Sequence, residues 1–303
     1  MSGLRVLRPG LFATVQDEGR RGAGRWGVPA SGFADPFSAA AANWLAGNPP
    51  GAALVEATLG AIELEAARPL AVGIAGAPAE VAVNGLSADR ARTLVLREGD
   101  RLAVGPATAG LRVYVAVSGG IAVAPVLGSR SALVPSAFGG LAGRKLAAGD
   151  DLPAAGAAIP EIRSLPFAGL PFDTGVLRAV AGPQRDLFAE SARRRFFGDA
   201  FRVSPRSDRR GLRLEGEGAA PSDGDILPEG IVVGSVQVPS GGEPIVLMPD
   251  GPVTGGYPKV AVVVAADLRV LGQLRPGDMV RFREISRTEA VAAYAARETA
   301  WPS

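Results

Sequence analysis

The sequence predicts a mainly β protein with two barrel-like halves and a few short helices, and three observations support this prediction. Short apolar runs bounded by glycine, proline and aspartate recur along the 303 residues, which is typical of strands in barrels or sandwiches. A Gly-Asp turn between apolar residues occurs at 96–102, 146–152 and 274–280 and suggests two halves of related build. Helix-capping signals mark only a few segments.

The apolar runs that predict strands are rich in valine, isoleucine and leucine and are too short for helices. A chain of this length usually forms about two domains. Between the halves, the segment Pro153–Pro171 is mostly alanine, glycine and proline, so we expect domains at residues 1–165 and 166–303. The clearest predicted strands are Leu70–Ala75, Glu80–Val83, Thr93–Leu96, Arg112–Val117, Val176–Ala181, Ile231–Val238, Pro244–Met248 and Val260–Ala265.

Three helices are predicted from their ends. Asp35 and Pro36 form an N-cap and a first helical position, so a helix is expected over Phe37–Ala46, with an alanine-rich apolar face. A second helix is expected from Pro183 to Phe197, with Gly198 as its stop signal and arginines in its last turn. Ser286 and Glu289 have the spacing of a capping box, which predicts a third helix ending near Glu298.

The composition narrows the possible chemistry. The chain contains neither histidine nor cysteine, which excludes disulfides, thiolate nucleophiles, imidazole bases and cysteine-type zinc sites. A formal net charge of +2 and 6% aromatic residues argue against a nucleic-acid partner. The N-terminus has no signal-peptide pattern, and the most apolar stretch, Val260–Ala266, is too short to span a membrane. We therefore expect a cytoplasmic protein.

Two glycine-bounded segments of the first half carry polar side chains beyond what turns require. Gln16, Asp17 and Arg20 lie in one of them, where a polar substrate is one interpretation and a solvated loop with a local Asp–Arg pair is the other. Ser129 and Arg130 follow Gly128 in the second segment and have the groups that bind phosphate or carboxylate. No Walker A string occurs in the chain.

Two further polar segments lie in the second half. In the first, Asp208 and Arg209 belong to an arginine-rich turn, which is either an anion site or a surface ion-pair network. The other extends from Gly234 to Lys259 and displays polar groups on a rigid Gly/Pro-rich frame; these are Gln237, Asp250, Thr254, Tyr257 and Lys259. Lys259 is notable because the only other lysine is Lys145 and the remaining basic residues are arginines.

Taken in order, several strings resemble the allophanate hydrolase subunit 2 family, also described as biotin-dependent carboxyltransferase-like proteins, and within it the 5-oxoprolinase C subunits. Two positions depart from the family pattern, since Ala132 and Pro228 stand where the family usually has Thr and Ser. The strings are Pro9–Arg20, Gly27–Asp35, Ala42–Asn48, Glu56–Gly60, Gly128–Ala132, Ser207–Gly216, Gln237–Ile245 and Thr254–Lys259.

The resemblance implies two cyclophilin-like β-barrel domains and a role in a multi-subunit enzyme. The enzyme would open 5-oxoproline to glutamate at the expense of ATP and Mg²⁺, both bound at the level of the complex. An allophanate hydrolase subunit 1-like protein, which is the B subunit of 5-oxoprolinase, and a further A subunit would be its partners. Two other readings stay open: a carboxyltransferase acting on a urea-like amide with a separate biotin carrier, and a non-enzymatic antagonist of a kinase inhibitor. No covalent biotin is expected, because an A-M-K-M string is absent.

Within this resemblance the polar segments supply the candidate site residues, and no metal ligand set is assigned to the chain. Arg130, Arg209 and Lys259 would bind anionic groups, while Gln16 and Gln237 would orient an amide. Asp17 or Asp250 would act as a base or a metal ligand. The catalytic candidates are Asp17, Asp250, Tyr257 and Lys259, and the substrate-binding candidates are Gln16, Arg20, Ser129, Arg130, Asp208, Arg209, Gln237, Thr254, Gly255 and Gly256.

Overall fold

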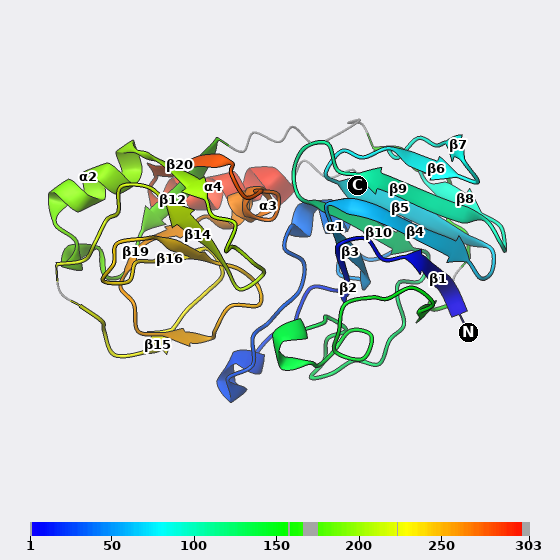
Figure 1. The fold of residues 1–303 in the computed structure, drawn as a ribbon, viewed down its shortest axis with the longest axis horizontal. Coiled ribbons are helices and arrows are strands. Elements are labelled where there is room, and N and C mark those ends of the chain that lie inside the picture. The colour runs from blue at the N-terminus through cyan, green and yellow to red at the C-terminus, as the bar shows by residue number, and fades with distance from the viewer. Residues whose placement is uncertain (1, 157, 166–174, 223, 299–303) are drawn as a thin grey trace. The chain divides into compact units, whose positions relative to one another are not determined.

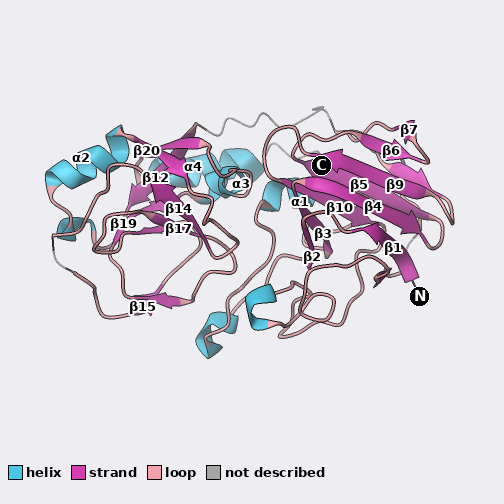
Figure 2. Ribbon diagram, viewed as in Figure 1, coloured by secondary structure: helices cyan, strands magenta, loops and turns pink. Residues whose placement is uncertain are grey.

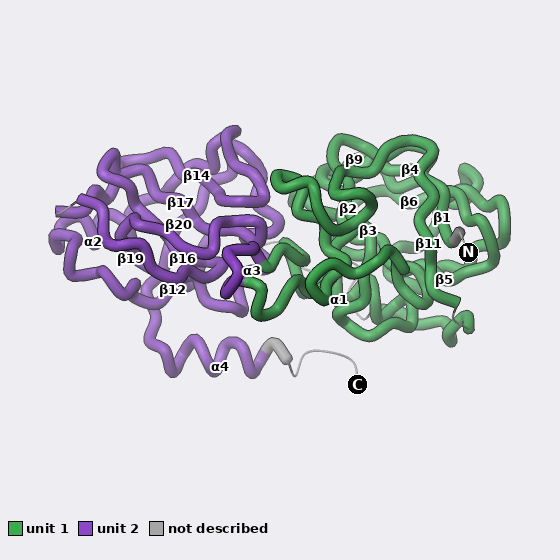
Figure 3. The backbone as a smooth tube through the Cα atoms, turned by 90° about the horizontal axis from the view of Figure 1, so that it is seen from below, with its two compact units in different colours: residues 1–23, 30–172 green, residues 24–29, 173–303 purple. Residues whose placement is uncertain are grey.

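The chain forms two compact units, which we describe separately (Figure 3). The structure, a computed structural model, describes residues 2–156, 158–165, 175–222 and 224–298. Unit 1 comprises residues 1–23 and 30–172, and unit 2 comprises residues 24–29 and 173–303. The predicted boundary between residues 165 and 166 borders the segment 166–174, which lies outside the described residues. Strands dominate both units (Figure 2), so the predicted mainly β class is confirmed.

Unit 1 contains two antiparallel sheets around one hydrophobic core (Figure 1). Strand β4 alternates between buried and half-buried residues, as expected for a strand with one face on the core. In order, the first sheet consists of β11 (Asp151–Pro153), β1 (Ser2–Arg8), β4 (Gly60–Ala66), β9 (Arg101–Pro106), β6 (Val81–Val83) and β7 (Leu86–Ser87). The second consists of β2 (Phe12–Gln16), β3 (Leu54–Thr58), β10 (Arg112–Val117), β5 (Leu70–Gly76) and β8 (Leu94–Leu96).

Helix α1 (Pro36–Leu45) covers the second sheet of unit 1 and contacts β5 and β10. These two strands are buried along their whole length, which explains why their sequences are continuously apolar. The approach is close: a Cβ atom on Gly73 of β5 would lie 2.0 Å from the carbonyl oxygen of Ala42. Small residues on the facing surfaces, Gly73 on β5 and the alanines of α1, therefore permit this contact.

The predicted cap of α1 is present, and its removal should destabilise unit 1. The Asp35 carboxylate accepts hydrogen bonds from the Ser38 amide at 3.0 Å and from the Ser38 hydroxyl at 2.5 Å. We expect Asp35→Ala to lower the free energy of unfolding by about 1 kcal/mol, the usual contribution of an N-cap. Urea denaturation measures this loss. Asp35→Asn retains an acceptor and should lose less, so equal losses in the two variants would contradict the cap as the cause.

Unit 2 is built on a closed seven-stranded barrel and a separate two-stranded ribbon. Parallel pairing of β12 with β20 closes the barrel, while its other neighbouring strands are antiparallel. Its strand order is β12 (Val176–Ala181), β19 (Lys259–Val263), β16 (Ser235–Gln237), β17 (Ile245–Leu247), β14 (Gly211–Glu215), β13 (Ala200–Val203) and β20 (Met279–Glu284). The ribbon, which we call the β15–β18 ribbon, pairs β15 (Glu229–Gly230) with β18 (Thr254–Gly255).

The helices of unit 2 confirm one prediction and correct another. Helix α4 (Arg287–Glu298) begins at the predicted capping box, in which Ser286 and Glu289 exchange hydrogen bonds. The helix predicted from Pro183 is wrong in its first part, because a 3₁₀ turn (Arg185–Leu187) precedes an extended Phe188 and α2 begins only at Glu190. Phe188 is buried, and its extended backbone interrupts the helix. Helix α2 (Glu190–Gly198) then packs Phe196 against Phe282 of β20, with ring centroids 4.5 Å apart.

Short helical segments complete the described chain. None of its helices is both long and apolar enough to cross a membrane. The remaining segments are the 3₁₀ turns η1 (Ala23–Trp26), η2 (Val134–Ser136) and η4 (Ala265–Asp267), and the short helix α3 (Leu268–Leu271).

Candidate functional site

In unit 1, Asp17 connects two of the segments that the sequence identified. Its carboxylate accepts hydrogen bonds from the Ser129 hydroxyl at 2.5 Å and the Ser131 hydroxyl at 2.6 Å. The backbone amides of Arg130 and Gly19 also donate to it, at 2.5 and 2.9 Å. Asp17 follows directly on β2 and is buried, so it holds the loop 129–131 against the end of that strand.

This set of donors determines the charge state of Asp17. Burial is the largest single influence and by itself raises the pKa of a carboxyl group. The hydrogen bonds from Ser129, Ser131 and the two amides outweigh burial, so the pKa of Asp17 lies below its usual value. An ionised carboxylate with four donors is a weak base. The geometry therefore favours a role for Asp17 in positioning the 129–131 loop over the role of base or metal ligand that the resemblance implies for Asp17 or Asp250.

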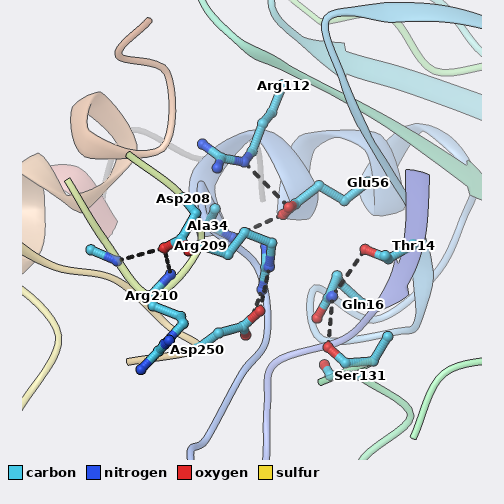
Figure 4. A network of polar contacts seen from close by, with 12 residues as sticks. Thr14, Gln16, Ala34, Glu56, Arg112, Ser131, Asp208, Arg209, Arg210 and Asp250 are labelled. Atoms are coloured by element: carbon cyan, nitrogen blue, oxygen red, sulfur yellow. Dashed lines mark hydrogen bonds and ion pairs between the residues drawn. The ribbon is translucent and has the colours of Figure 1, made fainter. Parts of the chain in front are cut away.

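Gln16 and Arg20, which flank Asp17 in the sequence, are both buried. The Gln16 amide nitrogen donates to Thr14 Oγ1 and to the Ala132 carbonyl, which fixes the orientation of the amide (Figure 4). Gln16 Oε1 is buried and, among the described residues, has no hydrogen-bond partner. Arg20 lies over the Phe138 ring at 4.3 Å and donates to the Ser131 carbonyl, which places it in the internal support of the same loop.

A second buried network in unit 1 was not predicted. Glu56 of β3 accepts hydrogen bonds from the Ala34 amide and the Tyr114 hydroxyl, both at 2.9 Å, and its Oε1 lies 3.3 Å from Arg112 Nε (Figure 4). Burial, followed by the charges of Glu56 and Asp35, raises the pKa of Tyr114 well above its usual value, so its phenol remains a donor. The sequence signals for this network were the Gly27–Asp35 and Glu56–Gly60 strings, which contain Ala34 and Glu56.

In unit 2, Arg209 and Asp250 form a buried bidentate ion pair (Figure 4). Arg209 Nε lies 2.8 Å from Asp250 Oδ2, and Arg209 Nη2 lies 3.1 Å from Oδ1. The neighbouring Asp208 is exposed and caps its own turn through the amides of Arg210 and Gly211. Arg209 and Asp250 therefore lie together, whereas the Asp208 side chain only stabilises its own turn.

The other predicted residues of unit 2 gather where the barrel meets the β15–β18 ribbon. Lys259 and Gln237 are Cα partners on β19 and β16, and both are buried. Lys259 Nζ lies 2.7 Å from Glu229 Oε1 on β15, and Gln184 also donates to Glu229. From the same region, Thr254 and Tyr257 are exposed, and Gly255 and Gly256 are half-buried. Glu229 and Gln184 were not among the predicted site residues: Glu229 directly follows Pro228, a departure from the family pattern, and Gln184 lies in a segment predicted as a helix.

These groups are suited to binding polar and anionic ligands. Within the described ranges, no group of three or more acidic side chains is arranged to hold a metal ion. The available chemistry is therefore that of a buried ammonium, guanidinium groups and amides, which bind carboxylates, phosphates and carbonyl oxygens.

The sequence is similar to several known proteins over nearly its whole length. Residues 26–284 match the carboxyltransferase domain family, subdomains A and B. The C subunit of the Escherichia coli 5-oxoprolinase is 34% identical, over 96% of this chain and 94% of that protein. The urea amidolyase of Lachancea kluyveri is 32% identical over 93% of this chain, but the match covers 17% of that protein.

Solved structures agree with these similarities. The crystal structure of TTHA0988 superposes with a TM-score of 0.85 at 37% identity, over 93% of this chain. This chain spans about half of that protein, since the match covers 55% of it. The urea carboxylase of Kluyveromyces lactis superposes with a TM-score of 0.89 at 30% identity, over 98% of this chain and 29% of that one.

Proposed function

The chain belongs to the carboxyltransferase domain family, subdomains A and B, and we propose that it is one component of an ATP-dependent 5-oxoprolinase that opens 5-oxoproline to glutamate. Sequence identity supports this proposal. The 5-oxoprolinase C subunits of Escherichia coli and Haemophilus influenzae are both 34% identical to this chain, over 96% and 92% of it.

The described residues support binding of this substrate class. A lactam with a carboxylate has one N–H donor, a carbonyl oxygen and an anionic group. In unit 2, the Lys259 ammonium carries the positive charge that a carboxylate requires, and its partner Glu229 is an exposed side chain.

We propose that the lactam is activated by the complete multi-subunit enzyme and not by this chain alone. Opening an amide ring is difficult without activation, and ATP would supply it. Within the described residues no group of three or more acidic side chains is arranged to hold a metal ion, and the sequence has no Walker A string. We propose that two partners, a B subunit of the subunit 1 type and a further A subunit, complete a cytoplasmic enzyme.

Carboxyl transfer is a second candidate function, favoured by the superposition on urea carboxylase with a TM-score of 0.89. It would require biotin carried outside these 303 residues, because they contain no A-M-K-M string and their methionines are Met1, Met248 and Met279. The two functions differ in their co-substrate. One consumes ATP with release of glutamate, and the other consumes carboxybiotin with carboxylation of an amide.

Reconstitution with the partner subunits tests the proposal. We expect the chain to co-purify with a subunit 1-like protein and to be inactive alone, and the complete complex to release glutamate from 5-oxoproline only with ATP and Mg²⁺. Glutamate is measured by a coupled assay, with a mixture lacking this chain as the control. A stable complete complex that releases no glutamate from 5-oxoproline in the presence of ATP would contradict the proposal. Transfer of label from carboxybiotin to an amide would establish the second candidate instead.

A further inference from the structure

Two buried polar groups of the barrel meet on neighbouring strands with incomplete hydrogen bonding. Gln237 and Lys259 are Cα partners in the β16–β19 pair, beside an irregularity in its register, so their side chains share one face of the pair. Their residues are 4% and 2% exposed. Gln237 Nε2 has no hydrogen-bond partner within the described residues, whereas Lys259 Nζ is paired with Glu229 Oε1. A buried amide of this kind is usually satisfied, so Gln237 Nε2 is available to a ligand.

The ion-pair partner of Lys259 comes from outside the barrel. Glu229 lies on the β15–β18 ribbon, and its Oε1 is 2.7 Å from Lys259 Nζ. The Glu229 side chain is 44% exposed, in contrast to 3% for Lys259. The anion therefore comes from a side chain that can rotate into solvent, while the cation is fixed in the barrel wall.

Gln184 holds this pair in position. Its Nε2 donates to Glu229 Oε1 at 2.8 Å, and its Oε1 accepts from the Lys259 amide at 3.2 Å. The hydrogen bond from Lys259, followed by that from Gln184, lowers the pKa of Glu229. Glu229 is consequently a carboxylate near neutral pH, with donors arranged around one of its oxygens.

The ribbon also covers the Gln237 amide. Gly255 is the Cα partner of Glu229 in the ribbon, and a Cβ atom on Gly255 would lie 2.4 Å from Gln237 Nε2. Only glycine permits this approach without displacement of the amide. The Gln237 amide and the Lys259–Glu229 pair therefore both lie where the ribbon packs on the barrel.

We propose that Lys259 and Gln237 form a subsite for a small carboxylate that carries a second oxygen acceptor, and that Glu229 occupies this subsite in the ligand-free chain. A ligand carboxylate replaces the Glu229 carboxylate on Lys259, so the buried ammonium keeps a counter-ion throughout. The second acceptor of the ligand takes the hydrogen bond from Gln237 Nε2. This inference rests on the proposed function only for the choice of 5-oxoproline as one probe. The subsite itself is defined by the contacts of Lys259, Gln237 and Glu229.

Calorimetric titration of the isolated chain tests the subsite with three probes. These are 5-oxoproline, pyruvate, which has a carboxylate beside a carbonyl, and 2-pyrrolidinone, which has the lactam ring of 5-oxoproline without its carboxylate. If Glu229 occupies the subsite nine-tenths of the time, Glu229→Gln should lower the Kd of the carboxylates by about tenfold. Lys259→Gln should weaken their binding at least tenfold, and 2-pyrrolidinone should respond to neither change.

The exposed Lys145 provides the matched control, since Lys145→Gln removes the only other lysine and should leave every titration unchanged. Glu229 is exposed, so Glu229→Gln is expected to fold and its gain in affinity is decisive even where Lys259→Gln is unstable. An unchanged carboxylate Kd in Glu229→Gln overturns the inference, as does full binding by a folded Lys259→Gln or failure of both carboxylates to bind.

The same titrations separate this inference from the proposed function. Pyruvate binding with the expected response to Glu229→Gln, without any binding of 5-oxoproline, supports the subsite and counts against 5-oxoproline as the substrate. ATP-dependent turnover by the complex with a KM for 5-oxoproline unchanged by Glu229→Gln supports the enzyme and overturns the subsite.

Discussion

Replacing Asp250 with alanine is expected to lower the free energy of unfolding of the barrel unit by about 3–5 kcal/mol, the usual loss when one partner of a buried ion pair is removed. Two contacts of 2.8 and 3.1 Å join Asp250 to Arg209, and the two side chains are 2% and 7% exposed. The variant leaves the guanidinium in the protein interior without its carboxylate, which is far less favourable than removing an exposed pair. Chemical denaturation followed by circular dichroism measures the change.

An exposed ion pair of the same unit is the matched control. Arg206 and Glu243 lie 3.4 Å apart with side chains 62% and 55% exposed, so Glu243→Ala should change stability by less than about 1 kcal/mol. Replacing both Arg209 and Asp250 by apolar residues should recover much of the loss, because no charge is then left buried. Equally small losses in Asp250→Ala and Glu243→Ala would show that Arg209 reaches solvent and would contradict the prediction.

The sequence predicted the interior strands better than the outer ones, for a physical reason. Strands β5 and β10 are buried on both faces, so their sequences are continuous apolar runs that coincide with the predicted Leu70–Ala75 and Arg112–Val117. Strand β20 instead alternates Val280 and Phe282 with exposed charged residues. For such a strand only the preceding Gly-Asp turn indicated its start.

The candidate site was predicted as separate segments, because contacts across the chain are not encoded in spacing. Asp17 and Ser129 are 112 residues apart, yet their side chains are 2.5 Å from each other. The separation of Arg209 from Asp250 is 41 residues. The motifs identified these residues as unusual, and only the fold shows that Asp17 supports a loop while Glu229 pairs with Lys259.

The loop support by Asp17 leads to the second large expected effect, in unit 1. Asp17→Asn removes the charge that accepts hydrogen bonds from two hydroxyls and two amides, and it introduces a donor among those donors. Hydrogen bonds to a charged group each contribute about 1.5–3 kcal/mol, and the four are not additive, so we expect a loss of roughly 3 kcal/mol at neutral pH. Asp151→Asn, at an exposed pair with Arg5 on the same unit, should lose less than about 1 kcal/mol.

The pH dependence of stability tests whether the negative charge of Asp17, and not only the shape of its side chain, stabilises the folded chain. The pKa of Asp17 in the folded chain lies below its usual value of 3.8, so the unfolded chain binds this proton more readily. The stabilisation is fully present above about pH 4 and is lost as the pH falls through the lower folded-state pKa. Denaturation measured between pH 7 and pH 3 should therefore show the wild type approaching Asp17→Asn on acidification. Parallel curves for the two proteins would mean that the charge of Asp17 does not hold the 129–131 loop.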